Sequence, residues 1–511
     1  NDIKADLFDE QTAYIALDNH KFGDYQPYLF KTTDGGKKWT SMSEGIPDGT
    51  LIWRIVQDHV NPNLLFLGTE YGVYVSVDQG EKWHKFSAGL PTISVRDLAI
   101  QKRENDLVLA TFGRSFYVLD DYSPLREINA ESIAKDAILF KPRKALQYNQ
   151  MYGGSGSSGG ATYKAKNPPY GAVFTYYLKE GFTSKKAARK KSEAGERANG
   201  TLLEKLSKAG YNTPTSILEE DIEKLAEKTE IELKKLKKLT KALSDQKSKD
   251  IPFPGWEALD AELNESKPEI VLIIKDANGT TVEQISAPFA KGINRVNWSL
   301  NVKLPTAIKT SAKNNYSDIR TMAEPGTYGV SMYKRVDGVL TDLNQKQSFE
   351  LERIRKNTLT NPLASEHKEY YKSIAALTKK VRTYEHKFDK TSKRVEAYLK
   401  NLGYIAGERM ALTEKVYELR TTMNELKREI GGSPSKAEVG EKDNVSLNSR
   451  LYNARGGWYP NSYGPTELHM ESFNMANELF ERIKPKVDAF LEKVSSVGKE
   501  FEAAGSPILL D

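Results

Sequence analysis

The sequence predicts a multidomain protein in which β-rich segments are followed by long helices. The first 125 residues contain short apolar runs separated by polar turns, which is typical of an all-β array. The last third carries apolar residues that recur every three or four positions, which is typical of amphipathic helices. A chain of 511 residues is also long enough for several domains, because domains commonly hold about 100 to 200 residues.

The composition excludes several classes of protein. Hydrophobic residues make up 39% of the chain, but no apolar run approaches the roughly 20 residues that a membrane span needs. The net charge of +6 comes from lysines that are interleaved with glutamates, which favours solvated helix faces over a nucleic-acid surface. The absence of cysteine excludes disulfides, thiolate metal sites and cysteine nucleophiles.

A repeated motif lies within the first 125 residues. The segments at 32–39 and 76–83 share the pattern Ser/Thr-x-Asp-x-Gly-x-x-Trp and stand 44 residues apart. A period of about 40 to 50 residues favours the blades of a propeller. We expect the carboxylates to accept turn N–H groups, the glycines to adopt positive φ, and the tryptophans to pack between neighbouring sheets. The predicted structural residues are Asp34, Gly36, Trp39, Asp78, Gly80 and Trp83.

These segments resemble the Asp-box (BNR) repeats of sialidases, certain β-glucanases and sortilin-type receptors. The stretches at 61–74 and 105–121 are similar to those of bacterial sortilin-like proteins, often labelled glycosyl hydrolases, although Phe112 replaces a frequent histidine. The resemblance implies that residues 1–125 are the terminal blades of an incomplete Asp-box β-propeller. About three blades are recognisable, whereas closed propellers use about four to eight. We therefore expect upstream propeller blades as partners, on the N-terminal part of the same parent or on a cleaved chain.

The middle of the chain predicts a second β domain. Residues 126–170 form a connector with a Gly/Ser-rich stretch, and residues 171–355 carry further strand patterns. The strands after residue 265 resemble the small Ig-like fold of flagellar hook-capping proteins. A Lys/Glu/Leu-rich insertion at about 183–250 is predicted to be helical.

Residues 356–511 predict a three-helix bundle. Three apolar stripes, which begin at Ile374, Leu412 and Phe473, each step by three and four residues. The aromatic loop with Trp458, Tyr459 and Tyr463 precedes the last helix. It either folds back onto the bundle or the propeller, or it forms a binding surface.

Catalytic patterns are weak. Asp34 and Asp78 could be glycosidase carboxylates, but structural turns are the expected role. Sialidase chemistry would need three arginines with a Tyr/Glu nucleophile pair and an Asp acid. The chain offers Arg54, Arg96, Arg114, Glu70 and Asp97 on separate strands, and nothing in the sequence shows that they converge. The pair at 120–121 could serve a glucanase or could simply end a strand.

The metal patterns are equally weak. None of the six histidines has a partner at metal-ligand spacing. The loop with Asp18, Asn19, His20 and Asp24 could touch calcium or a ligand, although an ordinary solvated loop explains it as well. We therefore expect no catalytic residue, no metal and no cofactor.

The resemblance implies a function in binding. We expect a non-catalytic protein- or peptide-binding or scaffold portion of an exported propeller protein, in the bacterial periplasm or at the cell surface, associated with the outer membrane. The expected partners are a protein or peptide ligand and an outer-membrane protein complex, with no nucleic acid and no membrane span. The alternative is part of a sialidase- or glucanase-like glycoside hydrolase whose site is completed by missing blades. The candidate binding residues are Tyr25, Tyr71, Arg114, Trp458, Tyr459 and Tyr463.

Overall fold

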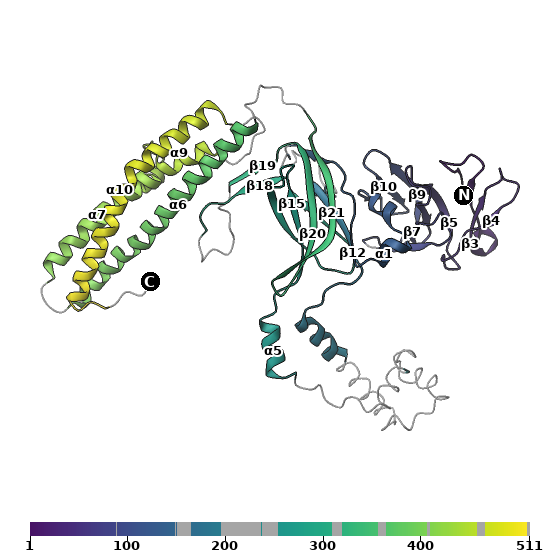
Figure 1. Ribbon diagram of the computed structural model, residues 1–511, viewed down its shortest axis with the longest axis horizontal. Coiled ribbons are helices and arrows are strands. Elements are labelled where there is room, and N and C mark those ends of the chain that lie inside the picture. Colours follow the sequence, from purple (N-terminus) through teal and green to yellow (C-terminus); the bar gives the residue numbers. More distant parts are fainter. Residues whose placement is uncertain are drawn as a thin grey trace.

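The protein combines several β-sheets with long helices, as the sequence predicts (Figure 1). Its computed structural model describes the residues 1–87, 89–148, 150, 165–195, 237, 254–308, 319–355, 364–405, 409–456 and 465–507. The Gly/Ser-rich stretch at 153–160, most of the predicted helical insertion, and Trp458, Tyr459 and Tyr463 lie outside these residues.

Three antiparallel sheets occupy the first 120 residues, each with its strands in chain order. The first sheet contains β1 (Asp2–Ala5), β2 (Ala13–Asn19), β3 (Asp24–Thr32) and β4 (Thr40–Ser41). The second sheet contains β5 (Ile52–Gln57), β6 (Leu65–Thr69), β7 (Gly72–Ser76) and β8 (His84–Phe86). The third sheet contains β9 (Val95–Gln101), β10 (Asp106–Thr111) and β11 (Phe116–Leu119). The sequence patterns miss β1, β4, β8 and β9.

The second sheet is covered on both faces by its neighbours. Side chains alternate across a strand, so Leu65 and Leu67 join one core while Phe66 joins another. The first core also contains Tyr14 and Leu29 of the first sheet, and the second contains Leu98, Leu107 and Leu109 of the third. The first strands of the three sheets, β1, β5 and β9, lie next to one another.

Two further sheets share one core in the middle of the chain. One contains β12 (Ala137–Leu139), β14 (Ala172–Leu178) and β17 (Gly292–Trp298). The other contains β13 (Ala145–Gln147), β21 (Val339–Arg353), β20 (Gly326–Val336), β15 (Glu269–Lys275) and β16 (Thr281–Ala287). Phe174 and Tyr176 from the first meet Ile270, Leu272 and Phe349 from the second. Residues 126–170 are thus more than a connector, because they supply β12 and β13.

Smaller elements join these sheets to their neighbours. The helices η2 (Ser123–Glu127) and α1 (Ala130–Ala134) follow the third sheet, and α5 (Trp256–Leu263) precedes β15. At the edge of the predicted insertion, residues 185–195 are helical, and Arg189 forms an ion pair with Glu262 of α5. A two-stranded ribbon, β18 (Asn301–Leu304) and β19 (Ile319–Met322), contacts the first long helix.

Three long helices share an apolar core near the C-terminal end (Figure 1). They are α6 (Ala364–Asn401), α7 (Met410–Gly431) and α10 (Glu467–Ala503), with the short α8 (Pro434–Glu438) and α9 (Leu447–Ala454) between α7 and α10. Their predicted stripes face one another, since Val381, Val416 and Val487 all lie in this core. Within the described part of the chain, no helix has the length and apolarity needed to cross a membrane.

Candidate functional site

The two repeated turns form the same hydrogen-bonded structure. Asp34 Oδ1 accepts the Thr32 hydroxyl at 2.9 Å and the Lys38 N–H at 2.9 Å. Asp78 Oδ1 accepts the Ser76 hydroxyl at 2.6 Å and the Lys82 N–H at 3.0 Å. The backbone N–H of Lys38 and the Thr32 hydroxyl lower the pKa of Asp34, so this carboxylate stays ionised and is unsuited to donate a proton. These contacts support the expected structural role.

A cavity of about 650 Å³ opens at the opposite end of these sheets. In the first and second sheets the repeated turn joins the third and fourth strands, whereas the cavity lies at the β2–β3 and β6–β7 turns and at the starts of β5 and β9. The repeated aspartates therefore cannot serve this cavity. Its lining includes Asn1, Asp18, His20, Lys21, Phe22, Tyr25, Trp53, Glu70, Tyr71 and Arg96.

At the floor of the cavity, the Glu70 carboxylate is contacted by three donor groups. Glu70 Oε2 accepts the Trp53 indole N–H at 2.9 Å and the Ser94 hydroxyl at 3.0 Å, and it lies 3.3 Å from the Arg96 guanidinium. That guanidinium also stacks on the Trp53 ring at 3.7 Å from its centroid, with Phe112 5.4 Å away. The cation–π contact and the ion pair fix Arg96 in one orientation.

The wall beside this floor is a second polar pair. His20 contacts Asp18 through Nδ1, and the His20 ring meets the Trp53 ring edge to face at 6.0 Å. Burial would raise the pKa of Asp18, but hydrogen bonds from His20 and Asn1 outweigh burial and lower it. Asp18 is therefore held as an anion.

Aromatic side chains form the exposed rim. Phe22, Tyr25 and Tyr71 line the cavity and each exposes about half or more of its surface. The predicted binding residues Tyr25 and Tyr71 thus meet at one cavity, whereas Arg114 is exposed outside its lining. Sequence reasoning placed His20 in a loop that could touch calcium or a ligand, and the structure puts it in the cavity lining. It did not assign Trp53 to a site, because a single aromatic at a strand start carries no signal of its own.

The arginines that a sialidase would need do not gather. Arg54 is held by Asp97 at 2.7 Å and by Asp2 at 3.0 Å, and it is outside the cavity lining. Of the three arginines considered, Arg96 alone lines the cavity, and it faces Glu70. The described residues of this cavity therefore lack a triad of arginines for a substrate carboxylate.

Asp120 and Asp121 directly follow β11 at the junction with the central sheets. The Asp121 backbone N–H donates to Asp106, and its carboxylate accepts the Ser123 hydroxyl at 2.6 Å. Their carbonyl oxygens accept the guanidinium of Arg295 on β17, at 2.6 Å for Asp120. These contacts tie the strand end to the next sheet through backbone oxygens. Burial and the nearby Asp106 raise the pKa of the Asp120 carboxyl, which lies outside the cavity lining.

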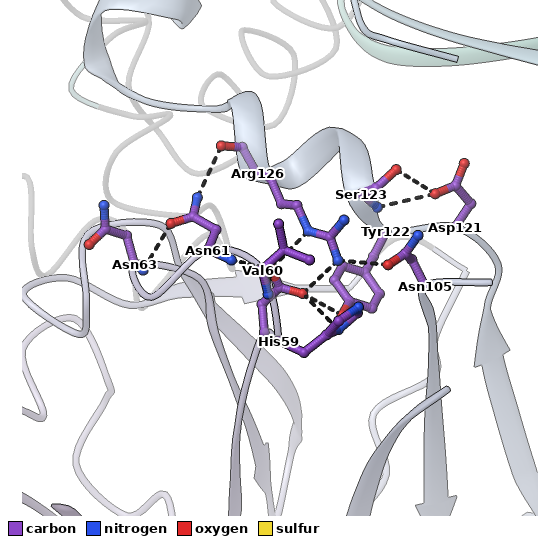
Figure 2. A network of polar contacts seen from close by, with 10 residues as sticks. His59, Val60, Asn61, Asn63, Asn105, Asp121, Tyr122, Ser123 and Arg126 are labelled. Carbon is purple, nitrogen blue, oxygen red and sulfur yellow. Dashed lines mark hydrogen bonds and ion pairs between the residues drawn. The ribbon is translucent and has the colours of Figure 1, made fainter. Parts of the chain in front are cut away.

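A buried ion pair joins the second and third sheets nearby (Figure 2). The Arg126 guanidinium donates to both oxygens of Asp58 at 2.8 Å, and the Tyr122 hydroxyl donates to Asp58 Oδ1 at 2.6 Å. Arg126 also donates to Asn105 Oδ1 at 2.7 Å, and the Asn61 side chain donates to the Arg126 carbonyl at 3.1 Å. No buried side-chain atom of this network lacks a hydrogen-bond partner, which is typical of a structural joint. Across the described residues, no cluster of three or more His, Asp or Glu side chains is arranged to hold a metal ion.

Comparisons with known proteins give slight likenesses. No family model matches the chain, and no curated protein matches it. Among solved structures, an ancestral GH74 enzyme is 16% identical with a TM-score of 0.19, covering 28% of this chain and 22% of that one. The GH74 xyloglucanase from Xanthomonas campestris is 17% identical with a TM-score of 0.18, covering 21% and 18%.

A third structure is the extracellular domain of a one component system from B. thetaiotaomicron. It is 10% identical with a TM-score of 0.16, covering 64% of this chain and 28% of that one. The chain thus spans less than a third of the length of each of these proteins. Scores of this size assign no activity to the chain.

Proposed function

We propose that the cavity binds a protein or peptide ligand without turning it over. The first three sheets are then blades of an Asp-box propeller, and the central sheets and the long helices are an Ig-like domain and a bundle that dock it to a partner. The setting is an exported protein of the bacterial envelope, in contact with an outer-membrane complex. This proposal rests chiefly on one contrast within the cavity: Glu70 with Arg96, and Asp18 with His20, are paired with each other, while the aromatic rim is free.

The state of the carboxylates that line the cavity supports binding over hydrolysis. A glycosidase pairs a carboxylic acid of raised pKa with a second carboxylate. Asp18 has the opposite shift, because its pKa is lowered. Glu70 Oε2 already serves three donors, so this oxygen has little capacity left for a substrate.

The rim suits recognition. Tyrosines offer a large apolar surface with a polar end, lose little conformational freedom on binding, and are common at interface hot spots. Tyr25 follows β2 of the first sheet and Tyr71 follows β6 of the second, and both line a cavity in which the Arg96 guanidinium stacks on Trp53. Such an arrangement needs little reorganisation when a peptide binds.

Selection from a display library of random linear peptides tests this proposal. We expect the chain to enrich a peptide family whose affinity falls about tenfold or more in Tyr71→Ala, as for a hot-spot residue. Tyr404→Ala, an exposed tyrosine on the helical side of the molecule, is the matched control and should bind normally.

Hydrolysis is the outcome that would overturn it. The same protein is incubated with a panel of oligosaccharides while new reducing ends are measured. Turnover that disappears in Glu70→Gln would establish the glycoside hydrolase alternative. A library that yields no peptide sensitive to Tyr71 would also refute the binding proposal.

A further inference from the structure

A second cavity lies where the central sheets, the two-stranded ribbon and α6 meet (Figure 1). Its volume is about 310 Å³. Small-molecule sites commonly measure about 300 to 1,000 Å³ and occur preferentially at the junctions of domains. The lining comes from the β15–β16 turn, the ribbon, the segment that leads into β20, the end of β21 and the start of α6. None of these residues lines the cavity around Glu70.

Apolar side chains form one part of this second cavity. Val282 and Val302 pack at the edge of the core of the central sheets. Leu304 and Tyr371 pack at the edge of a separate small cluster around Ile374 of α6. The cavity lies between these two clusters, so an apolar occupant would remove surface of both from water.

Three cations also line the cavity: Arg320 of β19, Arg353 of β21 and Lys368 of α6. The side chains of Arg320 and Lys368 have no hydrogen-bond or ion-pair partner among the described residues. Lys303 lies opposite Arg320 across the ribbon, and it pairs with Glu283 at 3.0 Å. Like charges directly opposite each other are unfavourable, so Arg320 gains from an added anion.

Arg353 is the cation that the fold holds in place. Its Nε–H donates to Gln147 Oε1 at 2.9 Å, and the Gln147 amide donates to the Ala323 carbonyl at 2.7 Å. The two terminal nitrogens of this half-buried guanidinium have no partner in the described part of the chain. Such a fork can bind both oxygens of one carboxylate.

Tyr371 adds a neutral donor beside these cations. Its hydroxyl makes no hydrogen bond with a described residue, and burial raises the pKa of the phenol. The hydroxyl therefore stays protonated and can donate to an acceptor in the cavity.

The carboxylates of the lining do not cancel its positive charge. Asp276 Oδ1 accepts the backbone N–H groups of Asn278 and Thr280 at 3.0 and 2.9 Å, within the β15–β16 turn. Glu324 is the other carboxylate of the lining. Three cations against two carboxylates leave a net charge of +1 in the lining. Positive charge beside apolar walls concentrates its field on an ionised ligand.

We propose that this second cavity binds a small organic acid, namely a monocarboxylate with an apolar body such as a medium-chain fatty acid. The carboxylate accepts from Arg353 and Tyr371, with Arg320 and Lys368 nearby. The apolar body lies against the two clusters. The bound acid thus touches the central sheets, the ribbon and α6 at once. The inference is independent of the cavity around Glu70 and of its peptide ligand.

Titration of the full chain with octanoate, measured by calorimetry, tests this inference. We expect octanoate to bind at least tenfold more tightly than octylamine or octan-1-ol, which carry the same apolar body without the carboxylate. Arg320→Gln and Arg353→Gln should each weaken octanoate binding about tenfold or more, because each removes a charged donor. Arg103→Gln, which removes an arginine with an 82% exposed side chain outside the lining, is the matched control and should bind normally.

Thermal unfolding without ligand separates lost binding from lost folding. Arg353 also holds Gln147, so the exposed Arg320 keeps the test decisive where Arg353→Gln unfolds. As a second readout, a fatty acid that carries a photoreactive diazirine should label the peptides that contain Met322 or Tyr371.

Three results would overturn the inference. They are the absence of octanoate binding, equal binding of octylamine, and photolabelling confined to other peptides. Inorganic phosphate that binds more tightly than octanoate would also overturn it, because the site would then suit a hydrophilic anion. Tyr71→Ala should leave every one of these readouts unchanged, so failure here and failure of the peptide proposal are distinguishable.

Discussion

Asp58 shows how a single buried carboxylate can hold two sheets together. Its side chain is fully buried, and its oxygens accept hydrogen bonds from Arg126, Tyr122 and the Asn61 backbone. Burial would raise the pKa of Asp58, but the bonds from Arg126 and Tyr122 outweigh burial and lower it. The residue therefore contributes stability only while it is ionised.

Asp58→Ala should destabilise the first three sheets by about 3 to 5 kcal/mol, because it leaves the buried Arg126 charge without its carboxylate partner. Hydrogen exchange of β6 amides would measure the loss. The double variant Asp58→Ala/Arg126→Ala should lose less than the sum of the single variants. Additive losses would show that the two side chains are not coupled.

The pH dependence of stability should follow the same carboxylate. A folded pKa below the unfolded value of about 3.9 gives stability that is present above that pH and is lost as the pH falls below it. Thermal unfolding of the wild type should therefore steepen its decline below about pH 4, and Asp58→Asn should decline less. Parallel curves for the two proteins would contradict this account.

At the scale of the element, the repeated turn is a module whose internal hydrogen bonds are the same whatever packs around it. Its carboxylate, hydroxyl and glycine satisfy one another within eight residues, and the contacts recur in both copies. The indole N–H of the buried Trp83 donates to Met42 of the preceding sheet, whereas that of the exposed Trp39 donates to Gly36 of its own turn. The same sequence motif can thus end in a buried or an exposed side chain.

Substituting the two glycines of the repeated turns should distinguish backbone strain within the turn from contact with the sheet that covers it. Gly36→Ala and Gly80→Ala incur the same strain of positive φ, about 1 kcal/mol or more each. Only Gly80→Ala also collides with Met42, so it should cost about 1 to 3 kcal/mol more in chemical denaturation. Equal losses would show that Met42 moves aside freely.

Much of this architecture could be predicted from the sequence, and the failures have physical causes. Alternation and turns indicated β2, β6, β7 and β10, and the motif indicated the bonds of the repeated turns. β1 and β9 were missed because Asp2, Arg96 and Asp97 interrupt their apolar pattern, although these charges are paired. β12 and β13 were missed because each has three residues and a partner distant in sequence. The cavity gathers residues from four turns and strand starts, which no local pattern encodes.

At the scale of the whole molecule, one arginine ties the first three sheets to the central ones. Arg295 on β17 donates to Thr175 of its own sheet at 3.1 Å and to the carbonyl oxygens that end β11. Arg143 adds an ion pair with Glu104 at 3.2 Å. At the other end, Ile319 of the ribbon packs against Ile374 of α6. Side-chain contacts, and not the chain connection alone, therefore position the parts.

Arg295→Lys should loosen the first of these joints. An ammonium cannot reach three acceptors with the fork of a guanidinium, and each hydrogen bond to a charged donor is worth about 1.5 to 3 kcal/mol. We expect faster hydrogen exchange in β11 and a larger radius of gyration by X-ray scattering. Arg103→Lys, which replaces a mostly exposed arginine, should leave both unchanged. A variant indistinguishable from wild type would show that other contacts hold the joint.

The parallel pairing of β13 with β21 can form only late in synthesis, because the two strands are far apart in the sequence. Gln147 and Arg353, which hydrogen-bond beside this pairing, are 206 residues apart. At about 5 to 20 residues per second, the ribosome needs roughly 10 to 40 s to make that stretch. β13 must wait unpaired for this interval, while the three earlier sheets have time to fold. A translational stop before Arg353 would thus release a protein whose first three sheets are folded and whose central sheets lack the pairing of β13 with β21.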